Sequence, residues 1–238
     1  MPWNRKKDGV DYPVTLSSFQ ILESLLASRH SCRGFLPKPV PRTTIEQILV
    51  ASQRTASWCN AQPWSLYVAS GGVLERLRAL LPELATQTPP NPDIEWPREY
   101  RGVYRERRRE CGFALYDAVS VAKGDRVASA KQGAENLRMF GAPHMAIVTY
   151  DEALGTYGAV DCGAYVATFM LVAESLGVAT IAQAALATYP APLREHLGIP
   201  KERTIVCGIS FGYADAAHPA NKFRTTRAPL GETVTWVE

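Results

Sequence analysis

The sequence predicts an α+β domain with one central β-sheet under several helices. The chain has 238 residues, of which 46% are hydrophobic and 21% charged, and this fits one large globular domain better than two small ones. The expected helices outnumber the expected strands. Segments of very uneven length separate the strands, without the βαβ repeat of a doubly wound sheet.

The first two expected helices begin with the spacing of a capping box. Ser17 is followed by Gln20 ahead of a run of apolar residues at helical spacing, which predicts a helix that ends near Ser28. Thr43 and Glu46 predict the start of a second helix in the same way. Between them, the prolines and the glycine of residues 29–41 (RHSCRGFLPKPVP) break any helix, so a basic loop is expected just past the first helix.

The next part of the chain is predicted as a strand over residues 64–69, a helix over 73–81 and a proline-dense excursion over 88–97 that could border a pocket. Two further helices are expected over residues 99–117 and 125–140. The first is rich in arginine, but apolar residues recur at helical spacing on another face. We therefore interpret its arginines as a solvated face.

The second half of the chain carries most of the expected sheet. Three strands are predicted: residues 144–150, 178–181 and 204–209. Helices are expected over residues 159–176, where Gly177 ends the helix, and over 191–197. The last twenty residues look extended and have no hairpin partner nearby in the sequence, so we expect them to pair with a second subunit.

Charge and targeting signals favour a soluble cytoplasmic protein. A net charge of +3 is too weak to indicate binding to nucleic acid or to an anionic membrane. No apolar stretch follows the basic residues of the N-terminus, as a signal peptide would require. Polar residues interrupt the apolar segment 159–176, so a core helix explains it better than a membrane span.

The five cysteines give no sign of a disulfide framework or a metal site. They are odd in number, form no CxxC pair and do not cluster with the four histidines. We expect reduced cysteines that pack as small hydrophobic residues, and no bound metal.

Residues 208–212 (GISFG) match the GxSxG motif of serine hydrolases, and Asp215 and His218 follow in the chain order of an α/β-hydrolase triad. A nucleophile elbow turns from a strand directly into a helix, whereas residues 213–221 read as a loop. Asp215 and His218 are also too close in sequence to come from separate strand ends. A hydrolase that uses Ser210 is therefore only a remote alternative.

Neither GxGxxG nor GxxxxGK[ST] occurs in the chain, so any nucleotide must be held by other means. Three blocks of sequence are suited to hold one, namely RHSCR at residues 29–33, WCNAQPW at 58–64 and FRTTRAPL at 223–230. Two separated arginine clusters and a loop that carries amide side chains can together bind a phosphate and the polar edge of a ring.

At these blocks the chain resembles the FMN-dependent nitroreductase family, and within it the group that includes bacterial nitrobenzoate-type reductases. The similarity runs from about Ser18 to Leu230 in the family's order. It also rests on two further stretches, FGAPH at 140–144 and AQAALATY at 182–189, and the last block begins earlier, as NKFRTTRAP at 221–229. The resemblance implies a nitroreductase-like α+β fold with a central mixed β-sheet surrounded by helices.

The same resemblance implies an intertwined homodimer with two FMN sites at the interface, each built from both chains, and an extended C-terminal arm. One FMN-binding domain is expected over residues 1–238. Within it, residues 1–16 form an N-terminal extension, 86–126 a variable substrate-pocket region and 220–238 the C-terminal arm.

By resemblance, Arg29 and Ser31 bind the FMN phosphate and Arg227 closes on it from the other side. A guanidinium suits a dianionic phosphate because it stays charged and donates two parallel hydrogen bonds. Arg33 is expected beside the flavin N1–C2=O edge, where a fixed cation stabilises the reduced flavin. His30 and Arg224, in the same two blocks, complete this cofactor-binding set.

Other residues are expected near the flavin ring and the acceptor. By resemblance, Asn60 hydrogen-bonds the isoalloxazine, and Gln62 is a second candidate. The backbone N–H groups of Gln183, Ala184 and Ala185 are expected to approach flavin N5. The candidate aromatic residues of the substrate pocket are Trp58, Tyr104, Phe113 and Tyr116.

The implied activity is a ping-pong NAD(P)H oxidoreductase: NADH or NADPH reduces FMN, and a flat, electron-poor acceptor such as a nitroaromatic is then reduced. The flavin carries the redox chemistry, so no protein residue is expected to be catalytic. Reductive dehalogenation, enone reduction and flavin fragmentation are alternatives on the same scaffold. A flavin-carrying or ligand-sensing protein without turnover is an alternative of a different class.

Overall fold

The computed structural model describes residues 3–5, 11–13 and 16–238. The first two segments, within the expected N-terminal extension, are the short strands β1 (Trp3–Arg5) and β2 (Asp11–Pro13), which pair antiparallel. Four strands form the central sheet: β3 (Ser65–Ser70), β4 (His144–Asp151), β5 (Ala179–Gln183) and β6 (Arg203–Gly212).

The central sheet has the strand order β3-β4-β6-β5, and each of these neighbouring pairs is antiparallel. The expectation of a mixed sheet is therefore wrong for the described strands. The loop of residues 29–41 crosses the β5 edge and makes a single parallel bridge there, between Ser31 and Thr180.

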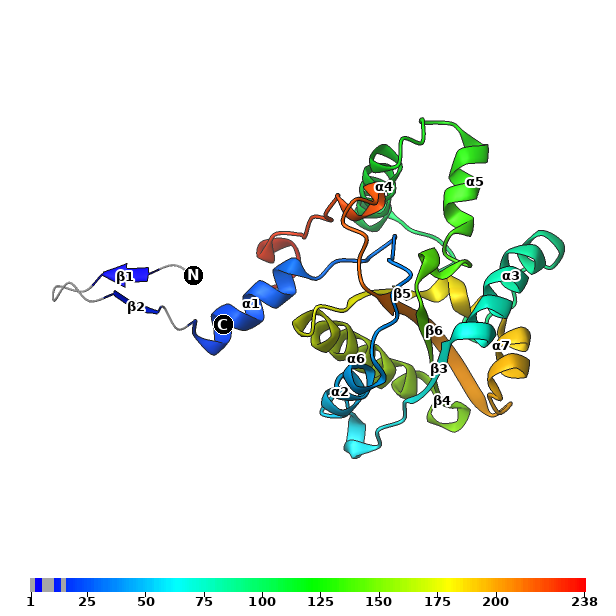
Figure 1. The fold of residues 1–238 in the computed structure, drawn as a ribbon, viewed down its shortest axis with the longest axis horizontal. Coiled ribbons are helices and arrows are strands. Elements are labelled where there is room, and N and C mark those ends of the chain that lie inside the picture. The colour runs from blue at the N-terminus through cyan, green and yellow to red at the C-terminus, as the bar shows by residue number, and fades with distance from the viewer. Residues whose placement is uncertain (1–2, 6–10, 14–15) are drawn as a thin grey trace.

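Helices cover both faces of the sheet (Figure 1). They are α2 (Arg42–Ser52) and α6 (Gly155–Ser175) on one face, and α3 (Gly71–Gln87) and α7 (Pro190–Leu197) on the other. The alternation of side chains along β4 explains the two cores, since Met145 and Ile147 pack with the α3 side whereas Ala146 and Val148 pack with the α6 side. The predicted α+β architecture is thus confirmed.

Residues 152–175 are long and apolar enough to cross a membrane by length and composition alone. In the structure this segment contains α6, which packs along the sheet with Cys162, Tyr165 and Phe169 fully buried. The expectation of a core helix is confirmed.

The two capping predictions have different outcomes. Helix α1 (Ser18–Ser28) begins with the expected capping box between Ser17 and Gln20. Helix α2 begins one residue before Thr43, after Pro41, and has no side-chain cap. The carboxylate of Glu46 instead accepts from Arg42 Nε at 2.8 Å, so the capping box predicted there is wrong.

Helices α4 (Gly102–Ala118) and α5 (Arg126–Ala134) stand away from the sheet and bury no residue completely (Figure 1). Helix α5 ends earlier than the predicted 140. Met139 and Phe140 adopt left-handed backbone angles, with φ of 54° and 51°, and their side chains are buried in the core. Anchoring these two side chains turns the chain out of the helix and into β4.

The proline-dense excursion of residues 88–97 lies against α7 and the start of β6. Asp93 accepts hydrogen bonds from both Nη atoms of Arg194, at 3.2 and 2.7 Å, and from the Ile205 N–H at 2.8 Å. The excursion does not line either of the two cavities described below.

Residues 219–238 carry no strand within the described chain. They contain the short 3₁₀ turns Pro219–Asn221 and Leu230–Glu232 and otherwise run without regular structure between α4 and α1 (Figure 1). At their end, the side chains of Trp236 and Val237 are 78% and 91% exposed. Nothing in the described chain covers this apolar end.

Candidate active site

The basic loop after α1 is held rigidly against the sheet. The Cys32 N–H donates to the Thr180 carbonyl at 3.0 Å, and the Leu36 N–H donates to the Tyr213 carbonyl at 2.8 Å. Gly34 lies so close to the ring of His218 that a Cβ atom at this position would overlap it. The segment that carries the predicted phosphate ligands is thus fixed between the β5 edge and the chain after β6.

A cavity of about 320 Å³ opens between this loop and the C-terminal arm. It is lined by Leu26, Ala27, Arg29, His30, Ser31, Arg33, Cys111, Phe223, Arg224, Thr225 and Arg227. Four of these residues are arginines, and none of the described lining residues is acidic. We call this space the arginine cavity. Its surplus of positive charge favours an anionic ligand.

Arg33 is a half-buried cation of the arginine cavity. Its Nη1 donates to the Ser31 carbonyl at 3.3 Å, and its guanidinium lies 5.6 Å from the ring centroid of Phe223. Burial lowers the pKa of Arg33 from its ordinary value, but a guanidinium remains charged at any physiological pH. A half-buried cation is costly unless an anion or electron-rich group binds near it.

Two of the other arginines approach from the arm. Arg224 Nη1 donates to the Asn221 carbonyl at 2.8 Å, and Arg227 Nη1 donates to Thr225 Oγ1 at 2.8 Å. Both guanidinium groups are therefore held by their own segment. The six residues predicted from the first and last blocks to bind the cofactor thus line one cavity: Arg29, His30, Ser31, Arg33, Arg224 and Arg227.

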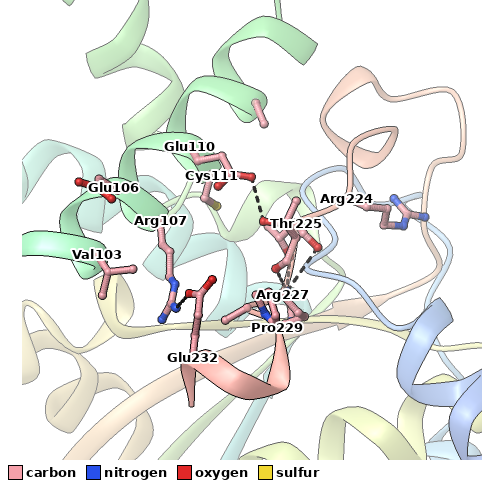
Figure 2. A pocket seen from close by; sticks show the side chains of 13 residues that line it. Val103, Glu106, Arg107, Glu110, Cys111, Arg224, Thr225, Arg227, Pro229 and Glu232 are labelled. Atoms are coloured by element: carbon pink, nitrogen blue, oxygen red, sulfur yellow. Dashed lines mark hydrogen bonds and ion pairs between the residues drawn. The ribbon is translucent and has the colours of Figure 1, made fainter. Parts of the chain in front are cut away.

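A second cavity, of about 690 Å³, lies beside the arginine cavity and shares Cys111, Arg224, Thr225 and Arg227 with it (Figure 2). It lies between α4 and the arm, so we call it the α4 cavity. Its other lining residues are Val103, Glu106, Arg107, Glu110, Ala114, Thr226, Ala228, Pro229 and Glu232.

Two polar contacts join α4 to the arm across the α4 cavity (Figure 2). Arg107 Nη2 lies 2.8 Å from Glu232 Oε2, and Thr226 Oγ1 donates to Glu110 Oε1 at 2.8 Å. The arm therefore forms one wall of both cavities. The predicted variable region contributes to the α4 cavity through α4 alone.

Asn60 and Gln62 line neither cavity of their own chain. Their loop rests on the first half of α6, where the Trp58 N–H donates to the Asp161 carboxylate at 3.2 Å. Cys59, Asn60 and Gln62 all have positive φ, at 51°, 55° and 48°. Strain of this kind in non-glycine residues costs about 1–3 kcal/mol each and is typical of functional segments.

The side chain of Gln183 is occupied within the core. Ser210 Oγ donates to Gln183 Oε1 at 2.5 Å, and Gln183 Nε2 donates to the Asn136 carbonyl at 2.9 Å. Ala184 is exposed and Ala185 is half-buried, at the start of the 3₁₀ turn Ala184–Ala187. This segment therefore offers a ligand its backbone and small side chains, and not the Gln183 amide.

The same contacts show that the serine hydrolase alternative is wrong. Ser210 is fully buried within β6. His218 Nδ1 accepts from the Ala220 N–H, and Asp215 accepts from the Ala217 N–H, so neither orients the other. The motif glycines serve packing, because a Cβ at Gly208 or Gly212 would lie within 2.6 Å of a neighbouring side chain.

The four predicted pocket aromatics also line neither cavity within one chain. Tyr104, Phe113 and Tyr116 lie on other faces of α4, because the residues that face the cavity follow the 3–4 spacing of Val103, Arg107, Glu110 and Ala114. Trp58 is 55% exposed and packs edge-on against Tyr157, at 4.1 Å between ring centroids.

The structure adds lining residues that the sequence analysis missed. Cys111 lies where the two cavities meet, and Phe223 and Thr225 belong to the quoted arm block but were not selected.

All five cysteines are free, and burial raises the pKa of Cys162 and Cys207 to about 12. No group of three or more His, Cys, Asp or Glu side chains is placed to hold a metal in the part of the chain that the structure describes.

The chain is similar to known proteins over most of its length. The family model described as "Nitroreductase family" matches residues 26–213. The chain is 33% identical to 4-nitrobenzoate reductase of Pseudomonas putida over 205 residues, which are 86% of this chain and 90% of that protein. It is 34% identical to nitroreductase NfnB of Mycolicibacterium smegmatis, over 92% of this chain and 94% of the relative.

A solved structure has the same fold over nearly the whole chain. The crystal structure of the FMN-dependent nitroreductase NfnB from Mycobacterium smegmatis in complex with NADPH superposes with a TM-score of 0.89 at 32% identity. The match covers 93% of this chain and all of that one.

Proposed function

Because this chain belongs to the nitroreductase family, we propose that it is an FMN-dependent oxidoreductase that uses NADPH or NADH to reduce nitroaromatic acceptors. The observation that carries the proposal is the arginine cavity, which holds four arginines and no acidic residue among its lining. Relatives at 33–34% identity that are named as nitrobenzoate reductase and nitroreductase support the choice of acceptor.

The donor set of the arginine cavity fits the phosphate of FMN. Arg29 and Ser31 approach from the loop, and Arg224 and Arg227 from the arm. Guanidinium groups on two sides can each donate paired hydrogen bonds to a dianion, and a hydroxyl adds a neutral donor. His30 lines the same space, where its Nδ1 donates to the Ser28 carbonyl at 3.1 Å.

Arg33 would lie beside the N1–C2=O edge of the isoalloxazine. It stays charged, and its position is fixed by the Ser31 carbonyl and the Phe223 ring. A fixed cation there stabilises the negative charge of the reduced ring without reorganisation. The bound FMN supplies the redox chemistry, taking a hydride from the nicotinamide and passing two electrons to the acceptor.

The chain's own contribution is to bind and orient the flavin. The backbone of residues 183–185 would face the ring near N5, where the small side chains of Ala184 and Ala185 leave room for a close approach. The buried bonds of Gln183 to Ser210 and Asn136 hold this backbone still. No proton-transfer residue of the protein is needed for hydride transfer.

We propose that the active form is an intertwined homodimer in which each flavin site is completed by the partner. Large apolar side chains are exposed on α1, α6 and the arm: Phe19, Leu22, Leu26, Tyr157, Val160, Trp236 and Val237. Exposure on this scale is typical of an interface. Asn60 and Gln62 lie outside the arginine cavity of their own chain, so they would reach the flavin ring of the partner.

The α4 cavity is the proposed acceptor site because it adjoins the arginine cavity and has a mixed apolar and polar wall. Trp58, Tyr104, Phe113 and Tyr116 remain candidates for contact with an acceptor across the dimer. The proposed location of the protein is the cytoplasm.

Steady-state oxidation of NADPH and NADH by the FMN-loaded protein tests the function. Consumption of nicotinamide should depend on an added acceptor such as 4-nitrobenzoate or nitrobenzene, and the reduced nitro product should form in proportion. Halide release from a halophenol with no reduction of a nitro group would instead assign dehalogenation to the same site.

A further inference from the structure

Asn221 is a buried polar side chain that links the two arginine-bearing segments. It is 7% exposed and lies at the end of the 3₁₀ turn Pro219–Asn221, at the start of the arm. Its Oδ1 accepts the Arg33 N–H at 2.7 Å, across 188 positions of sequence. Its Nδ2 donates to the Gly34 carbonyl at 2.8 Å and to the Asp215 carbonyl at 2.9 Å.

The geometry requires an amide at this position. One oxygen must accept from a backbone N–H while one nitrogen donates to two backbone carbonyls, and among the side chains only Asn and Gln carry this combination. The backbone of Asn221 also contributes, since its carbonyl accepts from Arg224 Nη1 at 2.8 Å.

We propose that Asn221 is a positioning residue of the flavin site, which sets the place of Arg33 through its side chain and of Arg224 through its backbone. This inference rests on the proposed function, in which Arg33 faces the flavin ring and Arg224 the phosphate. Asn221 lines neither cavity, so it acts on the cofactor only through these two arginines.

Loss of the Asn221 amide would remove the hydrogen bonds by which it holds the basic loop at Arg33 and Gly34. The Arg33 N–H would be left in a buried place without its partner, and a group of this kind moves to find another. The Gly34 carbonyl would keep its bonds from the Asp215 N–H and Cys32 Sγ, at 3.0 and 3.2 Å. The attraction between the Arg33 guanidinium and a charge on the flavin falls with distance. FMN should then bind more weakly, and the bound flavin should have a lower midpoint potential.

The test compares Asn221→Ala with a matched control, Tyr189→Phe. Tyr189 is also 7% exposed and also donates one long-range hydrogen bond to a backbone carbonyl, that of Thr88, at 3.2 Å. It lies beside the excursion of residues 88–97, away from both cavities. Both variants should lose thermal stability, but only Asn221→Ala should raise the FMN dissociation constant, by about tenfold or more, and lower the flavin potential.

A second variant keeps the shape of the side chain and decides the question if Asn221→Ala does not fold. Asn221→Asp retains an acceptor for the Arg33 N–H but presents a carboxylate to the Gly34 and Asp215 carbonyls. At neutral pH its FMN affinity and potential should be below those of the wild type. As the pH falls and the carboxyl binds a proton, it can donate again, so the deficit relative to the wild type should shrink.

Wild-type FMN affinity and potential in Asn221→Ala, or in Asn221→Asp at neutral pH, would overturn the proposal. The failure of the proposed function looks different, because the wild-type protein itself would then bind no FMN.

Discussion

The ring of His144, at the start of β4, holds the loop before α2 in place: its Nε2 accepts the Val40 N–H at 2.9 Å. The other ring nitrogen, Nδ1, lies 2.5 Å from Ser70 Oγ at the end of β3, and the ring stacks on Phe211 at 5.2 Å between centroids. Since Nε2 accepts a hydrogen bond, the ring must be neutral with its proton on Nδ1. The chain that leads from the arginine cavity to α2 therefore depends on an uncharged histidine.

This contact predicts a loss of stability in acid. Burial lowers the pKa of His144 below its ordinary value of about 6.5. Below that pH the unfolded chain binds a proton that the folded chain does not, so the free energy of unfolding should fall as the pH drops. The charged groups that line the cavity next to His144 are Glu75 and Arg78.

Chemical denaturation at pH 7.5 and 5.5, for the wild type and His144→Gln, measures this effect. The wild type should lose more stability than the variant between the two pH values. Equal losses would contradict the role given to His144.

Removing an arginine of the cavity should release FMN without unfolding the protein. Arg29→Ala and Arg227→Ala should each raise the FMN dissociation constant by roughly 10- to 100-fold, since a hydrogen bond to a charged group contributes about 1.5–3 kcal/mol. Arg105→Ala is the matched control, because Arg105 is an exposed arginine on α4 that lines neither cavity. Fluorescence titration with FMN would reveal the difference, and wild-type affinity in both cavity variants would refute the assignment of the phosphate site.

Arg33 should tune the flavin. Arg33→Gln should lower the two-electron midpoint potential by roughly 30–60 mV, since a charged hydrogen bond contributes about 1.5–3 kcal/mol and 30 mV corresponds to about 1.4 kcal/mol. The midpoint potential of Arg33→Lys, which keeps the charge, should lie between those of the wild type and Arg33→Gln. Spectroelectrochemical titration of the FMN-loaded proteins measures this order, and an unchanged potential in Arg33→Gln would exclude Arg33 from the ring edge.

Val160 should lie in the dimer interface. It is 58% exposed on α6, near the exposed Tyr157, so a charge introduced by Val160→Arg should dissociate the dimer and release FMN together. Val127→Arg is the control, because Val127 is also exposed, at 82%, but lies on α5 and not on α1, α6 or the arm. Sedimentation equilibrium distinguishes the species. A monomeric wild type with full FMN affinity would rule out a site shared between two chains.

Sequence reasoning succeeded where a local rule determines the structure. The capping box of Ser17 and Gln20 needs only neighbouring residues, and the order of strands and helices follows from runs of apolar residues. It failed where residues had the spacing that a rule requires but made a different contact in the structure. Thr43 has the spacing of a helix cap, yet the helix begins one residue earlier, directly after Pro41, and Arg42 takes the carboxylate of Glu46.

The candidate site was predicted from resemblance and not from a local rule. Arg29 and Arg227 come from two blocks that resemble the nitroreductase family, and the structure brings both to one cavity although 198 positions separate them. The parts that were missed depend on three-dimensional packing. Cys111 lines the two cavities because α4 packs against the arm. The sequence alone does not show which face of α4 is turned toward the arm.

The most direct test of the proposed function is the visible absorption spectrum of the purified, FMN-supplemented protein, recorded without oxygen before and after addition of NADPH or NADH. A bound flavin spectrum that bleaches with the nicotinamide and returns when a nitroaromatic is added is the predicted result. A protein that retains no flavin, or a bound flavin that neither nicotinamide reduces, would contradict it.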